Sequence, residues 1–390
     1  MCIENVVRSA LRRGDDVGSG KLDGRPRAMN HQVGGHPLQM AGRCVLKPIK
    51  LPRASMSMPE VAESTSDLDS DDSDPIKVYR GVRELAFYET IQFAAADASS
   101  DLSLSKTHML SELRLHTRIS SKGFFGSEKL TTSDIASIGL VLCLPKCIGD
   151  STVGNCVKTY RLALRCIKEE LLVMKQIARH TASYLGAVDL DGQGKSCHLI
   201  LDNLTLPYDR PNVMDLKVGR QVYEPAATIS AQQHKVAKYP EQSAIGFRIV
   251  GMKAYSPSSP NGHDDYEIWG KPFGKGLRTK EDALEALRIF FLASSGTMSP
   301  YTKRIILSVV DQLVEIRDWF RYNSTLAFYA SSILIVYEGN KTVREKIDPD
   351  VKMIDFAHVC RDDEEHSGRQ GYLYGIESLT EMLRMLLPNG

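Results

Sequence analysis

The stretch Pro211-Asn212-Val213-Met214-Asp215-Leu216-Lys217-Val218-Gly219 is the most informative segment of this chain. In an extended conformation, Asp215 and Lys217 point to one face of the strand, and the apolar residues beside them point to the other. We therefore expect one face to pack in a core while the other presents a paired acid and base. A structural salt bridge explains such a pair at least as often as catalysis does, so a second signal is needed.

A second acid stands at the end of a predicted apolar strand, in Met353-Ile354-Asp355-Phe356-Ala357-His358. An acid at a buried strand end needs a partner, and in phosphate chemistry that partner is usually a divalent metal. Taken together, the two stretches favour phosphoryl transfer, which needs a metal-bound acid and a lysine near the transferred phosphate. Lys47, at the end of the predicted strand 43–49, is a candidate for a further lysine on the nucleotide phosphates.

Composition excludes several classes of protein. The 390 residues are 42% hydrophobic and 25% charged, which is typical of a soluble globular chain with two or three packed units. The 49 Lys and Arg against 48 Asp and Glu give a net charge of +1, so a general nucleic-acid or membrane-surface binder is not expected. The apolar runs are too short to cross a bilayer. Eight thinly spread cysteines indicate a reducing compartment, the nucleus or the cytoplasm.

Patterning divides the chain into ordered segments and insertions. We expect a flexible tail at 1–30, an acidic disordered insertion at 51–74 and a serine-rich variable insertion at about 94–160. The acidic insertion is a candidate binding segment for a protein partner. Periodicity predicts helices beginning near residue 80 and at 162–182, 280–293 and 304–320, and strands within 184–204 and at 246–255, 330–337 and 351–356.

Several motifs resemble one known family. The chain resembles the inositol polyphosphate kinases, whose signature P-x-x-x-D-x-K-x-G is met by Pro211, Asp215, Lys217 and Gly219. Seven further segments match that family in order: His31–His36, Val45–Pro48, Arg80–Tyr88, Gly246–Met252, Ser331–Glu338, Asp355–His358 and Gly371–Gly375. The segments Val222–Pro225 and Lys238–Pro240 are most similar to the multikinase branch of the family.

The resemblance implies a two-lobed, protein-kinase-like α+β fold, with ATP in a cleft between an N-lobe at 31–201 and a C-lobe at 202–390. It further implies an ATP- and Mg²⁺-dependent kinase that phosphorylates hydroxyls of inositol tris- and tetrakisphosphates. For the nucleotide, it implies ATP phosphate binding by Lys47, adenine binding at the hinge by Asp202 and Leu204, and Mg²⁺ binding by Asp355 with Ser332. Asp215 would contact the ribose or the reacting groups, and Lys217 would contact the transferred phosphate and the acceptor hydroxyl. The other acceptor contacts would come from His358, from Arg80, and from His234, Lys235 and Lys238 in the segment 226–240.

Two other functions remain open at this point. A kinase that makes pyrophosphates from inositol hexakisphosphate would share the same core motifs. A catalytically silent scaffold that binds inositol phosphates would need none of the catalytic side chains, yet Lys47, Lys217 and Asp355 are all present. A degenerate site would be expected to have lost at least one of them.

Overall fold

Two five-stranded antiparallel sheets, one in each of two units, organise the computed structural model. Unit 1 holds strands β1 to β5, and unit 2 holds Gln176–Ala182 together with the chain from Asn203 onward. The structure describes residues 27–28, 32, 38–41, 44–49, six helical positions (84, 85, 87, 88, 91 and 95), 173–189, 197–225, 227–256, 266–293, 296–322, 326–340, 347–362 and 368–388. Residues 1–26, the acidic insertion 51–74, Arg80, the variable insertion apart from Ala95, and the first part of the predicted helix 162–182 lie outside the described residues.

The sheet of unit 1 has the order β1-β2-β3-β5-β4. Its strands are β1 (Arg27–Ala28), β2 (Gln39–Ala41), β3 (Cys44–Pro48), β4 (Tyr184–Asp189) and β5 (Cys197–Asp202), which confirms the strands predicted at 43–49 and within 184–204. Strand β1 lies inside the segment 1–30 that was expected to be a flexible tail. That prediction is wrong at this strand, where Arg27 pairs with Met40 of β2. The helix expected near residue 80 packs against this sheet, since Tyr88 is buried and its ring stacks on that of Tyr184.

The sheet of unit 2 has the order β11-β10-β6-β7-β8 and places the signature strand at its centre. Its strands are β6 (Pro211–Val218), β7 (Phe247–Tyr255), β8 (Tyr266–Trp269), β10 (Ser332–Glu338) and β11 (Asp350–Ile354). The strands predicted at 246–255, 330–337 and 351–356 are therefore confirmed within one or two residues. A separate two-stranded sheet pairs β9 (Leu326–Phe328) with β12 (Val359–Arg361).

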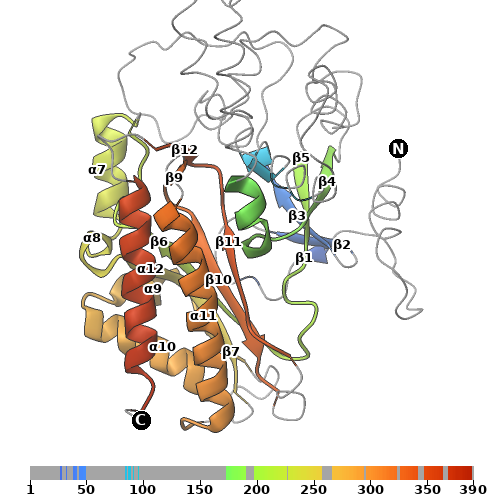
Figure 1. Cartoon of the computed structure of the whole chain (residues 1–390), viewed down its shortest axis with the longest axis vertical. Coiled ribbons are helices and arrows are strands. Elements are labelled where there is room, and N and C mark those ends of the chain that lie inside the picture. The colour runs from blue at the N-terminus through green and yellow to red at the C-terminus, as the bar shows by residue number, and fades with distance from the viewer. Residues whose placement is uncertain are drawn as a thin grey trace, which may run out of the picture. The chain divides into compact units, whose positions relative to one another are not determined.

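Helices cover the sheet of unit 2. They are α7 (Ile229–Ala237), α8 (Gln242–Ile245), α9 (Lys271–Gly276), α10 (Lys280–Leu292), α11 (Pro300–Tyr322) and α12 (Gly368–Met385). Helix α10 begins with a capping box formed by Thr279 and Asp282. Helices α11 and α12 lie side by side, α11 against β11 and α12 against β6 and β7 (Figure 1). None of the described helices combines the length and apolar character needed to cross a membrane.

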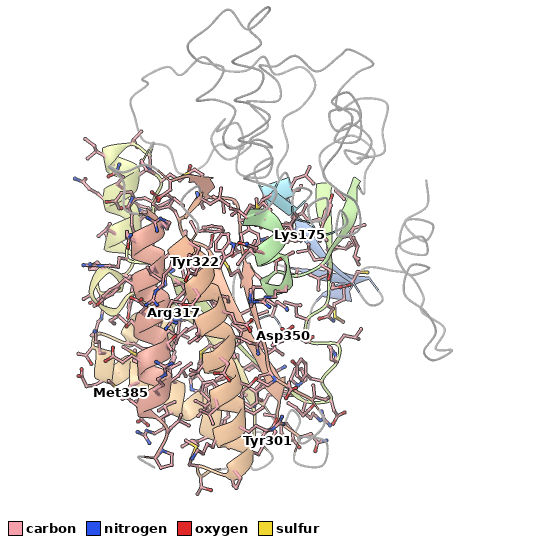
Figure 2. The ribbon with its side chains drawn as sticks, viewed as in Figure 1. Lys175, Tyr301, Arg317, Tyr322, Asp350 and Met385 are labelled. Atoms are coloured by element: carbon pink, nitrogen blue, oxygen red, sulfur yellow. The ribbon has the colours of Figure 1, made fainter. Side chains whose placement is uncertain are left out.

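The long helices confirm the predicted periodicity. The expected face of the helix 304–320 is buried at Ile305, Val309, Leu313 and Ile316. Helix α11 extends beyond the predicted bounds at both ends, from Pro300 to Tyr322, and its length can be followed between Tyr301 and Tyr322 in Figure 2. Apolar spacing of this kind is strongest in the middle of a helix, which is why the ends were underestimated.

The segment Gln176–Ala182 belongs to unit 2 although both of its neighbours in sequence belong to unit 1. The predicted helix 162–182 is α-helical at 173–177, tightens into a 3₁₀ turn at Ala178–His180 (η1) and then ends. Thr181 forms a parallel bridge with Met353 of β11. The Lys352 ammonium donates a 2.6 Å hydrogen bond to the Arg179 carbonyl. These contacts hold the segment against the edge strand that leads to Asp355.

Candidate active site

Strand β6 carries Asp215 and Lys217 on one face, as predicted. Its pairing with β10 is regular, and the extra residue at the irregularity between β6 and β7 lies in β7. Asp215 is nevertheless buried, and Lys217 is only partly exposed, so the charged face of this strand is covered rather than open. The Lys217 ammonium donates a 2.8 Å hydrogen bond to the carbonyl of Ala330. A central strand thus holds a lysine whose ammonium position is set by the backbone just before β10.

The start of β10 supplies buried hydroxyls beside Lys217. Ser332 pairs with Lys217 on one side and with Ile354 on the other. Ser331 and Ser332 are both fully buried, and neither hydroxyl oxygen has a hydrogen-bond partner among the described residues. Burying a hydroxyl without a partner costs free energy, so such groups call for an explanation.

Asp355 follows β11 at the same end of the sheet. Its φ of 65° is left-handed, as is the φ of 53° at Ala330. Non-glycine residues rarely adopt this conformation, and strained residues are concentrated at functional sites. Because Ile354 pairs with Ser332, the backbone of Asp355 lies next to the start of β10. Two strained residues therefore flank the buried serine.

Asp355 and Ser332 fit an incomplete magnesium site. Mg²⁺ prefers oxygen ligands and is commonly held by one or two carboxylates, with substrate phosphates and waters completing its shell. Asp355 offers a carboxylate, and Ser332 offers a buried oxygen that makes no hydrogen bond to the described residues. Among those residues no group of three or more His, Cys, Asp or Glu could hold a metal without such help.

Three glycines meet just beyond Lys217. Gly219 and Gly246 have φ values of 108° and 93°, and the Gly219 N–H donates to the Gly246 carbonyl at 2.8 Å. A Cβ at Gly375 of α12 would lie 2.3 Å from the Gly246 oxygen and 2.8 Å from the Gly219 nitrogen. Only glycine permits these conformations and this backbone approach. The close approach joins three of the sequence motifs and fixes the end of β6.

Gln242 adds a second restraint at the end of β6. Its buried side-chain amide donates to the carbonyls of Lys217 and Gly219 at 3.3 and 3.0 Å. The backbone on both sides of Val218 is therefore held by the glycines and by this amide. A lysine on such a restrained strand loses little further freedom on binding a phosphate.

His358, predicted to contact the acceptor, is paired within unit 2. Its Nδ1 atom contacts a carboxylate oxygen of Glu224, and both side chains are mostly buried. Sequence reasoning had used Glu224 only as part of the segment 222–225, so its role as the partner of this histidine was missed. A carboxylate on one ring nitrogen fixes the orientation of the ring.

The basic residues expected to bind the acceptor lie on an exposed helix. Thr228 caps α7 by accepting a hydrogen bond from the Ala231 N–H, and no residue of α7 is buried. His234 is exposed on α7 and Lys238 is exposed at its C-cap, and Lys235 is partly buried. The predicted helical placement of these residues is confirmed, while their contact with a ligand stays a prediction. Arg80, the further residue predicted for this role, lies outside the described residues.

In unit 1, Lys47 forms an ion pair that was not predicted. Its ammonium lies 2.6 Å from a carboxylate oxygen of Glu84, and the two side chains are 16% and 5% exposed. Protein kinases use a lysine and glutamate pair of this kind to hold the lysine for the nucleotide phosphates. The signal was present in the segment Arg80–Tyr88, where Glu84 stands among apolar residues, but its partner could not be read from sequence.

The predicted adenine-binding residues, Asp202 and Leu204, lie at the chain crossing, which is the point where the chain passes from unit 1 to unit 2. Asp202 is the last residue of β5 and of unit 1, and its N–H donates to the Ser183 carbonyl at 3.0 Å. Unit 2 begins with a turn in which the Asn203 side chain accepts hydrogen bonds from the N–H and hydroxyl of Thr205. Leu204 lies inside this turn and is partly buried. The turn ties the crossing to a defined backbone conformation.

Comparison with known proteins gives a consistent assignment. Residues 198–384 match the family model described as inositol polyphosphate kinase. The chain is 33% identical over 168 residues to the inositol polyphosphate multikinase of Rattus norvegicus, covering 43% of this chain and 40% of that protein. It is 30% identical over 233 residues to the inositol polyphosphate multikinase alpha of Arabidopsis thaliana, covering 56% and 78%. It is 26% identical over 272 residues to the inositol hexakisphosphate kinase 2 of Rattus norvegicus, covering 60% and 59%. The match thus spans well under half of the rat multikinase.

Proposed function

Because this chain belongs to the inositol polyphosphate kinase family, we propose that it transfers the γ-phosphate of ATP to hydroxyls of inositol tris- and tetrakisphosphates. The observation that carries the proposal is the convergence of Lys217, Ser332 and Asp355 at one end of the sheet of unit 2. A lysine, a buried hydroxyl and a carboxylate are the groups that phosphoryl transfer requires. The similarity to multikinases over the same part of the chain supports this acceptor class.

Lys217 would neutralise negative charge on the phosphoryl group during its transfer. The hydrogen bond to the Ala330 carbonyl already orients its ammonium, a group that donates to phosphate oxygens as a compact positive charge. A group that is positioned before the reaction costs no reorganisation in the transition state. Asp215, buried two residues earlier, would hold the ribose or the reacting groups.

Asp355 and Ser332 would hold Mg²⁺, which when bound neutralises charge on the nucleotide phosphates. The left-handed backbone at Asp355 turns the chain immediately after β11. Asp355 therefore stands at the end of the sheet where Ser332 is buried. Rigid strands on both sides keep the two oxygen donors in register. Ser332 pairs with Lys217 on one side and with Ile354, the residue before Asp355, on the other, so metal and lysine would act on the same phosphate chain.

The remaining contacts complete both substrate sites. Lys47, oriented by Glu84, would bind ATP phosphates, and the crossing at Asp202 and Leu204 would bind adenine. The acceptor phosphates would be bound by the cations of the segment 226–240, with help from His358 and from Arg80.

The experiment uses the full chain with ATP, Mg²⁺ and inositol 1,4,5-trisphosphate, with products separated by anion exchange. We expect stepwise formation of tetrakis- and pentakisphosphates, lost in Lys217→Ala and Asp355→Asn. Lys303→Ala, which removes an exposed lysine of α11, is the matched control and should retain wild-type turnover. A purified, folded protein that leaves this acceptor unchanged would contradict the proposal.

A second candidate is a kinase that converts inositol hexakisphosphate to pyrophosphates. The observation that favours it is the 60% of this chain that matches a hexakisphosphate kinase, a larger share than matches the rat multikinase. The same assay separates the two, because only the second candidate would leave trisphosphate untouched and extend hexakisphosphate. If neither compound turns over but both bind, the chain is a scaffold for inositol phosphates.

A further inference from the structure

Arg248 is a partly buried cation next to Lys217 that the sequence motifs did not single out. It is the second residue of β7 and stands directly opposite Lys217 of β6. Residues opposite each other in an antiparallel pair have their side chains on the same face of the sheet. The guanidinium of Arg248 therefore lies on the face that carries Asp215 and Lys217.

The hydrogen-bonding capacity of Arg248 is unused. Among the arginines of unit 2 whose burial the structure describes, three others are partly buried, and each has a carboxylate partner: Arg304 with Asp348, Arg317 with Asp318 and Arg369 with Asp362. The guanidinium of Arg248 donates no hydrogen bond to, and forms no ion pair with, any residue that the structure describes. A guanidinium has five N–H donors and stays charged. A partly buried guanidinium without an anionic partner is therefore suited to bind an anionic ligand.

The position of this guanidinium is set by an aromatic ring. Arg248 lies 5.8 Å from the ring centroid of Tyr239, which is 4% exposed. The Tyr239 hydroxyl is itself held, because it donates a 2.6 Å hydrogen bond to the Leu277 carbonyl. Burial raises the pKa of Tyr239 to about 12, so the ring stays neutral beneath the cation. A cation–π contact of this kind holds the guanidinium near the ring and occupies none of its N–H donors.

Charge around Arg248 favours an anion. Burial lowers the pKa of Arg248, and the nearby carboxylate of Asp215 opposes that shift. Asp215 attracts the guanidinium from a distance without a hydrogen bond, and Lys217 stands opposite in the adjacent strand. An arginine edge next to an ammonium matches two oxygens of one phosphate, because the planar fork binds phosphate in a bidentate way.

We infer that Arg248 binds a ring phosphate of the inositol acceptor beside the hydroxyl that Lys217 serves. This inference rests on the proposed function and adds to it a residue that selects the acceptor. The acceptor is favoured over ATP because Tyr239, whose ring lies next to Arg248, belongs to the segment 226–240 that is assigned to the acceptor. Lys47, the cation assigned to the ATP phosphates, belongs in contrast to unit 1.

The test compares Arg248→Lys and Arg248→Leu with Arg304→Lys in the full chain. Arg304 also lies over a tyrosine ring, at 5.4 Å from the centroid of Tyr301, but it has Asp348 as its partner. We expect Arg248→Lys to raise the KM for inositol trisphosphate about 10-fold and Arg248→Leu about 100-fold, since each lost bond is to a charged group. The KM for ATP should stay within about twofold of wild type in all three variants.

A second measurement keeps binding separate from turnover. Titration calorimetry of inositol 1,4,5-trisphosphate against wild type and Arg248→Lys should show the same loss of affinity, with Arg304→Lys equal to wild type. Among acceptors that each lack one phosphate, one should bind wild type and Arg248→Lys equally, and that compound identifies the phosphate concerned. If Arg248→Leu does not fold, Arg248→Lys alone decides.

Three results would overturn the inference. Unchanged acceptor affinity in a folded Arg248→Lys protein would remove Arg248 from the acceptor site. A rise in the KM for ATP without a change for the acceptor would assign Arg248 to the nucleotide. An equal effect in Arg304→Lys would show a general charge effect. If wild type binds the trisphosphate but does not turn it over, the proposed function fails while the calorimetry still tests Arg248.

Discussion

The two ends of the sheet in unit 2 differ in whether their buried polar side chains form hydrogen bonds. At the end marked by Tyr301 in Figure 2, Glu338 is fully buried and its two carboxylate oxygens accept the N–H groups of Asp209, Arg210 and Asn340 at 2.7, 3.0 and 2.6 Å. At the other end, the hydroxyls of Ser331 and Ser332 have no hydrogen-bond partner among the described residues. At one end backbone N–H groups satisfy the buried carboxylate, and at the other end the two buried serine hydroxyls make no such bonds.

The difference separates buried polar groups that stabilise the fold from buried polar groups that are available to a ligand. Satisfied buried groups rigidify a fold, and each of the bonds to Glu338 closes a turn next to β6 or β10. Unsatisfied buried groups and left-handed residues cost free energy, so a fold retains them where a ligand repays that cost. Both ends belong to the same strands, which makes them internal controls for each other.

The largest expected effect is at Asp355. Asp355→Asn keeps the size of the side chain and tolerates a positive φ as well as aspartate does. If Asp355 holds Mg²⁺ as proposed, removing the charge of its carboxylate should lower kcat by about 10³-fold or more. The free energy of unfolding, measured in urea, should change by less than about 1 kcal/mol. Loss of stability equal to the loss of activity would show that this end of the sheet is structural after all.

The next largest effect is at Glu338, and it should be the reverse. Glu338→Ala leaves three backbone N–H groups without their acceptor, which should lower the free energy of unfolding by about 4 kcal/mol. The kcat of the molecules that remain folded should stay near wild type. Chemical denaturation and turnover per folded molecule at low temperature measure the two quantities. A protein with full stability and impaired turnover would erase the contrast between the two ends.

A pH dependence should appear at the segment that covers β11. Burial lowers the pKa of His180 to about 4, with a contribution from Arg179 and Lys352, and its Nε2 accepts a hydrogen bond from Arg179. The 3.4 Å contact with Glu315 is therefore no ion pair at neutral pH. Because the unfolded chain takes up this proton near pH 6.5 and the folded chain only near pH 4, stability falls between those values as pH decreases. The loss should reach roughly 3 kcal/mol.

Denaturation at several pH values measures this loss. His180→Gln keeps an acceptor for Arg179 and does not titrate, so its free energy of unfolding should lack this part of the slope between pH 6.5 and 4. A slope identical to that of wild type would assign the effect to other groups. Lys352 and Glu315, which face His180 from β11 and α11, are the groups to substitute next.

The smallest effect compares two buried serines. The Ser332 hydroxyl has no described hydrogen-bond partner, while the Ser378 hydroxyl donates to the Ile245 carbonyl at 2.7 Å. Ser332→Ala should leave stability unchanged or raise it, and should lower kcat about 10-fold at limiting Mg²⁺. Ser378→Ala should lower stability by about 1 kcal/mol and leave kcat unchanged. Equal behaviour of the two variants would mean that Ser332 has no metal to hold.

Several elements could be predicted because their signals are local. The alternation around Asp215 and Lys217 predicts β6, and the spacing of Ile305, Val309 and Leu313 predicts α11. The identity of the motif residues also indicated the phosphate chemistry. The helix 162–182 was overextended because its end is set by the bridge between Thr181 and Met353, which no local pattern records.

The sequence by itself determined the strands that carry Lys47 and Lys217 and the strand that Asp355 follows, because side-chain periodicity and residue chemistry depend only on near neighbours. Tertiary structure alone decided which groups meet. It paired Glu84 with Lys47 and Glu224 with His358, and it left Arg248 without an anion. Those outcomes depend on contacts between residues that are far apart in the chain. Packing selects such contacts as a set, and no single segment contains the information.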